Sequence, residues 1–199
     1  CREVVTKYDV DGILYDDYFY PNGIASSVAA PDYKEWQNSG TDLSIGDWRR
    51  ENVSRMVKAV YDMIQREKPW VRFGISPAGV ACTSQSLADK YGPDPCPPGS
   101  DWQYNGIFSD PVSLLKGHLI DFIAPQVYWK IGFKRADFSL VAPWWCKTAR
   151  KFSRQAFVSM CIDKLMTTSE FPEWAAEMEI LRRNCAKDQG GTIFWSVRN

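Results

Sequence analysis

The chain has 199 residues, of which 45% are hydrophobic, so it is long enough for one domain with a sizeable core. Its 24 basic and 24 acidic residues give a formal net charge of zero, which argues against a nucleic-acid or anionic-membrane partner. Trp, Tyr and Phe make up 14% of the chain, and such rings suit stacking on sugars, although ordinary core packing also explains them.

The chain is predicted to open with a helix end and a strand. Residues 2–7 read as the last turns of a helix, so the chain is expected to begin inside a domain. The stretch from Tyr8 to Pro21 then passes from an apolar, β-prone run to two adjacent carboxylates, aromatic residues and a proline, which predicts a buried strand that ends in a functional loop. Because side chains alternate along a strand, Leu14, Asp16 and Tyr18 share one face. Only one of the two aspartates can therefore point into a site on that face, and we expect it to be Asp16.

Strands and helices are then predicted to alternate. Residues 22–46 form a long loop, a length that is usually functional, and Asp47 is a suitable N-cap for a helix that runs to about Lys68. Further strands are predicted at 71–77, 119–129, 156–161 and 192–197. Helices are predicted after Ser109-Asp110-Pro111, with Ser109 or Asp110 as the cap, over 137–152, and from Ser169 or Glu170 to about 186, while residues 78–107 form a loop. This order favours an α/β fold with parallel strands and right-handed crossovers.

Five stretches resemble bacterial glycoside-hydrolase-like proteins of the DUF187 type, a TIM-barrel group. In order, they are YDVDGILYDDYFYP, WRRENVSRMVKAVYDMI, VRFGISPAG, LIDFIAPQVYW and GGTIFWSVRN. The resemblance implies that residues 1–199 are a single domain, a partial (β/α)8 barrel whose five parallel strands correspond to barrel strands four to eight, with strands one to three missing. It also implies activity on β-linked bacterial polysaccharide, including peptidoglycan glycan strands, and a periplasmic, outer-membrane-anchored or secreted location.

Glycoside hydrolysis needs two carboxyl groups, about 5–5.5 Å apart for retention of configuration or about 6.5–9.5 Å apart for inversion. Asp16 is the first candidate, because barrel enzymes carry catalysis at the C-terminal ends of their strands. Asp17 is either a second catalytic group or an acid that Arg49 or Arg50 holds as a bidentate partner. Since adjacent side chains diverge, the second acid is expected elsewhere, and Asp110 is the best-placed candidate, although a helix-cap role also explains it.

The opening strand also resembles the acid-rich fourth strand of chitinases, but Leu14 and Tyr18 stand where that signature has acids. This departure puts a substrate-assisted mechanism in doubt. The predicted sugar contacts are polar and aromatic groups near strand ends or in the following loops: Tyr18, Tyr20, Arg49, Ser76, Gln126, Tyr128, Trp129 and Trp195. Two other functions stay open. One is a non-catalytic carbohydrate-binding or scaffold barrel, and the other is a divalent-metal enzyme with Asp16 and Asp17 as oxygen ligands.

No cofactor is expected. With His118 as the only histidine, neither a zinc site nor a Ser-His triad is credible, and Gly190-Gly191 is a strand entry rather than a phosphate loop. Cys82 and Cys96 bracket one loop and could be a disulfide or two free thiols. No apolar run reaches the ~20 residues of a membrane span. A partial barrel leaves two open sheet edges, which another chain, a second copy or an absent N-terminal portion is expected to cover. If this segment is made alone, we expect it to associate through those edges.

Overall fold

The computed structural model describes residues 1–82, 96–162, 171–186 and 190–196. In chain order its elements are α1 (Arg2–Lys7), β1 (Gly12–Asp16), α2 (Tyr33–Asn38), α3 (Ile45–Glu67), β2 (Arg72–Ser76), a π-helical turn (Trp102–Gly106), α5 (Pro111–Lys116), β3 (Phe122–Ile123), α6 (Phe138–Lys151), β4 (Gln155–Cys161), α7 (Phe171–Asn184) and β5 (Gly191–Trp195).

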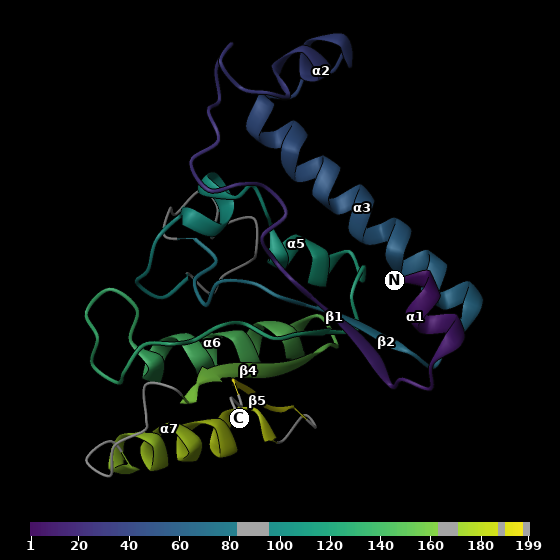
Figure 1. The fold of residues 1–199 in the computed structure, drawn as a ribbon. Helices are drawn as coiled ribbons and strands as arrows, with labels where there is room; N and C mark the ends of the chain where they lie inside the picture. The colour runs from purple at the N-terminus through teal and green to yellow at the C-terminus, as the bar shows by residue number, and fades with distance from the viewer. Residues whose placement is uncertain (83–95, 163–170, 187–189, 197–199) are drawn as a thin grey trace.

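The five strands form one parallel sheet in the order β1-β2-β3-β4-β5. The sheet curls, and the chain passes through at least one helix between each strand and the next, as Figure 1 shows. In this register Asp16 lies beside Ser76 at the end of β1 and β2, and Cys161 lies beside Trp195 at the end of β4 and β5. A closed barrel of this type has eight parallel strands, and this sheet has five. The predicted fold class, a partial (β/α)8 barrel with five parallel strands, is therefore confirmed.

The two faces of the sheet differ in what covers them. On the helix side, Val57 and Ile64 of α3 share a buried core with Phe73, Ile75 and many other apolar residues. On the opposite face, which would be the barrel interior, Leu14 keeps 41% of its surface exposed. The Phe122 ring fills the space above Gly74, where an added Cβ would lie 2.4 Å from that ring. The helix side is therefore a closed core, while the inner face is open at its edges.

Two predicted element boundaries were wrong. The N-cap of α3 is Ser44 rather than Asp47, and its Oγ accepts a hydrogen bond from the Asp47 backbone N–H at 3.1 Å. Asp47 thus sits in the first turn, where a carboxylate also suits the helix dipole. β3 has only two residues instead of the predicted 119–129, because Pro125 has no N–H to donate to the ladder. Pairing resumes beyond it, where Gln126 bridges both Ala78 and Ser159.

Other predictions met different outcomes. The predicted loop 22–46 contains the short helix α2. Of the two residues left open as the cap of α5, Ser109 and Asp110, the N-cap is Asp110, and Pro111 lies in the first turn as predicted. The predicted start of the last helix at Ser169 or Glu170 and the end of the last strand at residue 197 lie outside the described residues.

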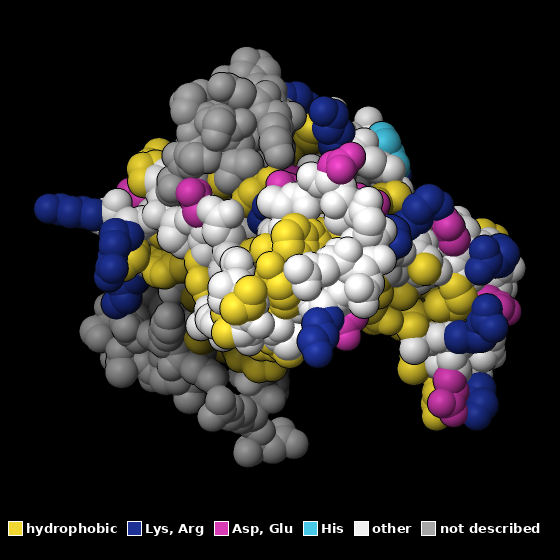
Figure 2. Space-filling view, turned by 90° about the horizontal axis from the view of Figure 1, so that it is seen from above, with side chains coloured by type: hydrophobic (Ala, Val, Ile, Leu, Met, Phe, Trp, Pro, Cys, Tyr) yellow, Lys and Arg dark blue, Asp and Glu magenta, His cyan; other side chains and the backbone are white. Residues whose placement is uncertain are grey.

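The cysteines form one disulfide and one close pair of thiols. Cys146 of α6 is bonded to Cys185, directly after α7, a link that the sequence did not reveal. Of the two states left open for Cys82 and Cys96, the structure has free thiols, with the sulfur atoms 3.1 Å apart. Basic and acidic side chains lie intermixed on the face seen in Figure 2. Among the described helices, none is both long and apolar enough to cross a membrane.

Candidate active site

Five of the predicted site residues line one pocket of about 290 Å³. They are Asp16, Tyr18, Gln126, Tyr128 and Trp195. They come from the ends of β1 and β5 and from the segment that follows β3. Parallel strands place their C-terminal ends at the same edge of the sheet, so residues more than a hundred positions apart meet here. The pocket combines one carboxylate, one amide, two phenols and one indole.

A short hydrogen-bond chain orients the Asp16 carboxylate. Gln126 Nε2 donates to Asp16 Oδ1 at 2.7 Å and also to the Ser76 carbonyl at 3.1 Å. The other end of the same amide, Oε1, accepts from the Tyr18 hydroxyl at 3.3 Å. Ser76 itself is buried, and its Oγ donates to the Ala124 carbonyl. Ser76, a predicted sugar contact, therefore accepts a hydrogen bond from the Gln126 amide and does not line the pocket.

The pocket favours the protonated forms of its acidic groups. Burial raises the pKa of Asp16 above its usual value, although the hydrogen bonds from Gln126 and from the Asp17 backbone N–H oppose the shift. Burial, with the nearby charge of Asp16 among the lesser causes, also raises the pKa of Tyr128 to about 12, and the pKa of Tyr18 moves in the same direction. Both phenols are hydrogen-bond donors at neutral pH. A carboxyl group with a raised pKa suits proton donation to a leaving group.

Asp17 points to the opposite side of the strand from Asp16, as the alternation predicted. Its side chain has no exposed surface, and its Oδ2 accepts from Gln103 Nε2 and Ser109 Oγ, each at 2.7 Å. Its Oδ1 is buried with no hydrogen-bond partner among the described residues. Burial is the main reason that its pKa rises to about 7, and the charge of Asp16 adds to it. Because the two carboxylates diverge, they cannot bind one metal ion together, and the described residues hold no cluster of three or more potential metal ligands.

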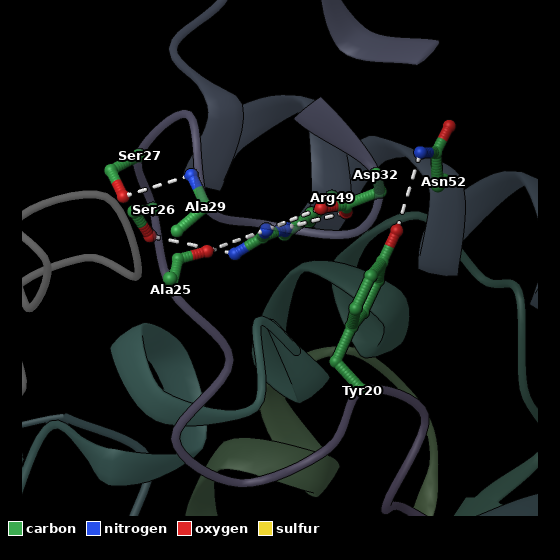
Figure 3. Close-up of polar contacts among 8 residues, drawn as sticks. All are labelled: Tyr20, Ala25, Ser26, Ser27, Ala29, Asp32, Arg49 and Asn52. Carbon is green, nitrogen blue, oxygen red and sulfur yellow. Dashed lines mark hydrogen bonds and ion pairs between the residues drawn. The ribbon is translucent and has the colours of Figure 1, made fainter. Parts of the chain in front are cut away.

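Of the two roles left open for Asp17, the one in which Arg49 or Arg50 holds it as a bidentate partner is wrong. Arg49 makes a bidentate ion pair with Asp32, from Nε to Oδ2 at 2.8 Å and from Nη2 to Oδ1 at 2.6 Å, and also donates to the Ala25 carbonyl (Figure 3). Arg50 pairs with Asp47 at 2.9 Å. Arg49 is fully buried, so in this structure it cannot act as the predicted sugar contact. It fastens the segment before α2 to α3.

Tyr20 belongs to the same cluster around Arg49. The Arg49 guanidinium group lies 4.6 Å from the centre of the Phe108 ring and 5.6 Å from that of Tyr20. The Tyr20 hydroxyl accepts from Asn52 Nδ2 at 3.4 Å, as Figure 3 shows. Tyr20 was predicted to contact the sugar, but its ring and its hydroxyl are both engaged outside the pocket.

The last two predicted residues also lie outside the lining of the Asp16 pocket. Asp110 accepts from the Ser113 backbone N–H and hydroxyl, which is the helix-cap role, so its role as second acid stays a prediction. Trp129 lines a separate pocket of about 200 Å³ together with Phe133 and Arg135.

The sequence did not point to Gln103, Ser109 or Trp102. These residues follow a Pro- and Gly-rich stretch and lie in or near a π-helical turn. Such a turn has no hydrophobic periodicity from which it could be predicted. The only available signal was Asp17 itself, because a carboxylate on the face of the strand opposite Asp16 needs hydrogen-bond donors when it is buried.

Comparisons with known proteins identify the family of the chain. The family described as Glycosyl hydrolase-like 10 matches residues 1–175. Glycosyl hydrolase YngK of Bacillus subtilis (strain 168) is 35% identical over 189 residues, which cover 92% of this chain and 35% of YngK. Glycosyl hydrolase DigH of Escherichia coli (strain K12) is 32% identical over 178 residues, which cover 86% of this chain and 38% of DigH. This chain thus spans little more than a third of either relative, and it belongs to the glycosyl hydrolase-like 10 family.

Proposed function

We propose that this chain supplies the catalytic face of a glycoside hydrolase that cleaves β-linked bacterial polysaccharide, with peptidoglycan glycan strands as the candidate substrate. The observation that carries the proposal is the Asp16 pocket, in which an oriented carboxyl group with a raised pKa lies among an amide, two phenols and an indole. Membership of a glycosyl hydrolase-like family supports the same conclusion.

Each group has a role that follows from its chemistry. Asp16 is the proton donor to the glycosidic oxygen, since its raised pKa keeps a larger fraction protonated. Tyr18 and Tyr128 donate hydrogen bonds to sugar hydroxyls, and the Trp195 ring, 58% exposed, gives a flat apolar surface for a pyranose face. The second carboxyl group comes from Asp110 or from outside the described residues, at the spacing that sets retention or inversion.

The test is Asp16→Asn, which keeps the shape of the side chain and removes the acid. We expect release of reducing ends from β-linked glycans to fall by about 10²–10⁴-fold, the usual contribution of a positioned acid or base. Glycan binding should stay within about twofold, because an amide can still accept from Gln126. Asp62→Asn, an exposed change on α3, is the matched control and should leave turnover intact. Full turnover by the Asp16 variant would contradict the assignment.

A non-catalytic carbohydrate-binding barrel is the second candidate. It is favoured by one observation: among the described residues, Asp16 is the only carboxylate that lines the pocket. Glycan binding without any release of reducing ends by the wild-type protein would select it. For either function we propose a periplasmic, outer-membrane-anchored or secreted location, which cell fractionation tests.

A further inference from the structure

A buried polar contact joins the back of the site to the π-helical turn. Gln103, within this turn, has no exposed surface, and its two amide atoms are both engaged. Its Nε2 donates to Asp17 Oδ2 at 2.7 Å, and its Oε1 accepts from the Ala78 backbone N–H at 2.8 Å. An amide held at both ends in the interior has one orientation. The turn is therefore fixed to the ends of both β1 and β2.

A second bond fixes the other side of the turn to the same oxygen. Ser109 Oγ donates to Asp17 Oδ2 at 2.7 Å, and the residue before it, Phe108, has a φ of 53°. This left-handed conformation is unfavourable for a residue with a bulky side chain and is kept only where the surroundings enforce it. Asp17 thus binds both Gln103 and Ser109, which lie at the two ends of the segment that contains the turn.

The residue next to Gln103 is an aromatic side chain beside the pocket. The Trp102 ring packs edge-on against Tyr18, with ring centres 6.0 Å apart, and its Nε1 donates to Asn22 Oδ1 at 2.8 Å. Tyr18 lines the Asp16 pocket and is 53% exposed, while Trp102 is half-buried. Trp102 therefore lies beside Tyr18, an aromatic residue of the pocket, without lining the pocket itself.

We propose that Trp102 binds a sugar unit next to the one in the Asp16 pocket, and that Asp17, through Gln103, is the positioning residue that holds Trp102 there. The inference rests on the proposed glycan function and adds an outer subsite to it. It gives Asp17 a role that its burial allows, because a carboxylate with no exposed surface cannot touch a substrate.

The position of Trp102 makes the test depend on ligand length. Binding of N-acetylglucosamine, a single unit, and of its β-1,4-linked hexamer is measured by calorimetry in the Asp16→Asn background. Trp102→Ala should weaken hexamer binding by about threefold to tenfold, the size of one aromatic contact, and leave monomer binding unchanged. Trp102→Phe should lose less. Trp70→Ala, which removes a tryptophan that is 66% exposed at another surface, is the control and should change neither affinity.

The positioning role is tested by Gln103→Ala and by two changes at Asp17. Gln103→Ala should weaken hexamer binding as Trp102→Ala does, with monomer binding retained. Asp17→Asn keeps an acceptor for both donors and should bind the hexamer as the background protein does, whereas Asp17→Ala should not. If Asp17→Ala fails to fold, Gln103→Ala carries this part of the test.

The outcomes separate this inference from the proposed function. Failure of the background protein to bind any glycan overturns the proposed function and this inference together. Hexamer binding that is unaffected by Trp102→Ala, or equal losses for monomer and hexamer, overturns the subsite alone. Hexamer binding that survives Gln103→Ala overturns the positioning role.

Discussion

Two adjacent aspartates have opposite surroundings because the strand turns their side chains to opposite faces. Asp16 lies in the pocket with an amide donor, while Asp17 is sealed behind the strand with two donors on one oxygen and none on the other. Sequence periodicity predicted this divergence and the pocket position of Asp16. It could not predict the partners of Asp17, because these come from a loop with no regular period. The arginines that seemed available satisfy other acids.

Asp17 should make stability fall as pH rises. Its pKa of about 7 in the folded protein exceeds its ordinary value of 3.8, so the folded state holds a proton that the unfolded state releases. The stabilising contribution of the protonated form is complete below pH 3.8 and is lost as pH rises toward 7, on the order of 4 kcal/mol in total. Asp17→Asn cannot ionise. Urea unfolding at pH 5, 6.5 and 8 should therefore show the variant gaining on wild type as pH rises, and a constant difference would contradict the burial argument.

At the scale of elements, the positions of most strands could be predicted from the sequence, and the structure of irregular segments could not. The apolar runs predicted at 71–77 and 156–161 became β2 and β4 with bounds that differ by at most one residue, and the run predicted from 192 became β5, because strands buried in parallel sheets are continuous apolar runs. The stretch from Tyr8 to Pro21 contains β1, as predicted. β3 was overestimated because Pro125 interrupts its ladder. The same difference explains which predicted residues line the pocket. Gln126, Tyr128 and Trp195 lie at or after strand ends and line it, whereas Arg49 and Tyr20 pack elsewhere through tertiary contacts that no local pattern reveals.

The segment before α2 is held to α3 mainly by Arg49, which gives an element-scale prediction. Arg49→Lys removes the bidentate geometry and the stacking on Phe108, and leaves Asp32 poorly paired. We expect the free energy of unfolding to drop by about 2–4 kcal/mol, near the range for breaking a buried pair. Lys58→Met, which breaks the exposed pair with Asp62, is the control and should cost less than about 0.5 kcal/mol.

Urea unfolding at pH 7 measures both variants. Glycan affinity of folded Arg49→Lys should equal that of wild type, because Arg49 does not line the pocket. Wild-type stability combined with lost glycan binding would instead restore the sugar-contact role that the sequence suggested for this residue.

For the whole molecule, the open edges of the sheet determine whether the chain self-associates. Within the described residues β1 pairs only with β2, and β5 only with β4, so both outer edges present unpaired backbone groups. The inner face adds apolar surface at Leu14, which would be interior in a closed barrel. The alternation of strands and helices predicted the parallel α/β sheet, and the family resemblance implied that it is a partial barrel, from which the open edges follow.

We therefore predict that this 199-residue chain, when made alone, self-associates through its edges and inner face, because exposed parallel edges are templates for further pairing. Size-exclusion chromatography with light scattering should show a mass above 22.8 kDa that falls on dilution. Leu14→Lys places a charge on the inner face beside the β1 edge and should shift the chain toward monomer. Leu140→Lys is the matched control, because Leu140 is a leucine of similar exposure, 51% against 41%, but lies on α6 outside the sheet. A wild-type chain that stays monomeric at all concentrations, or equal effects of the two substitutions, would show that the edges are not the contact.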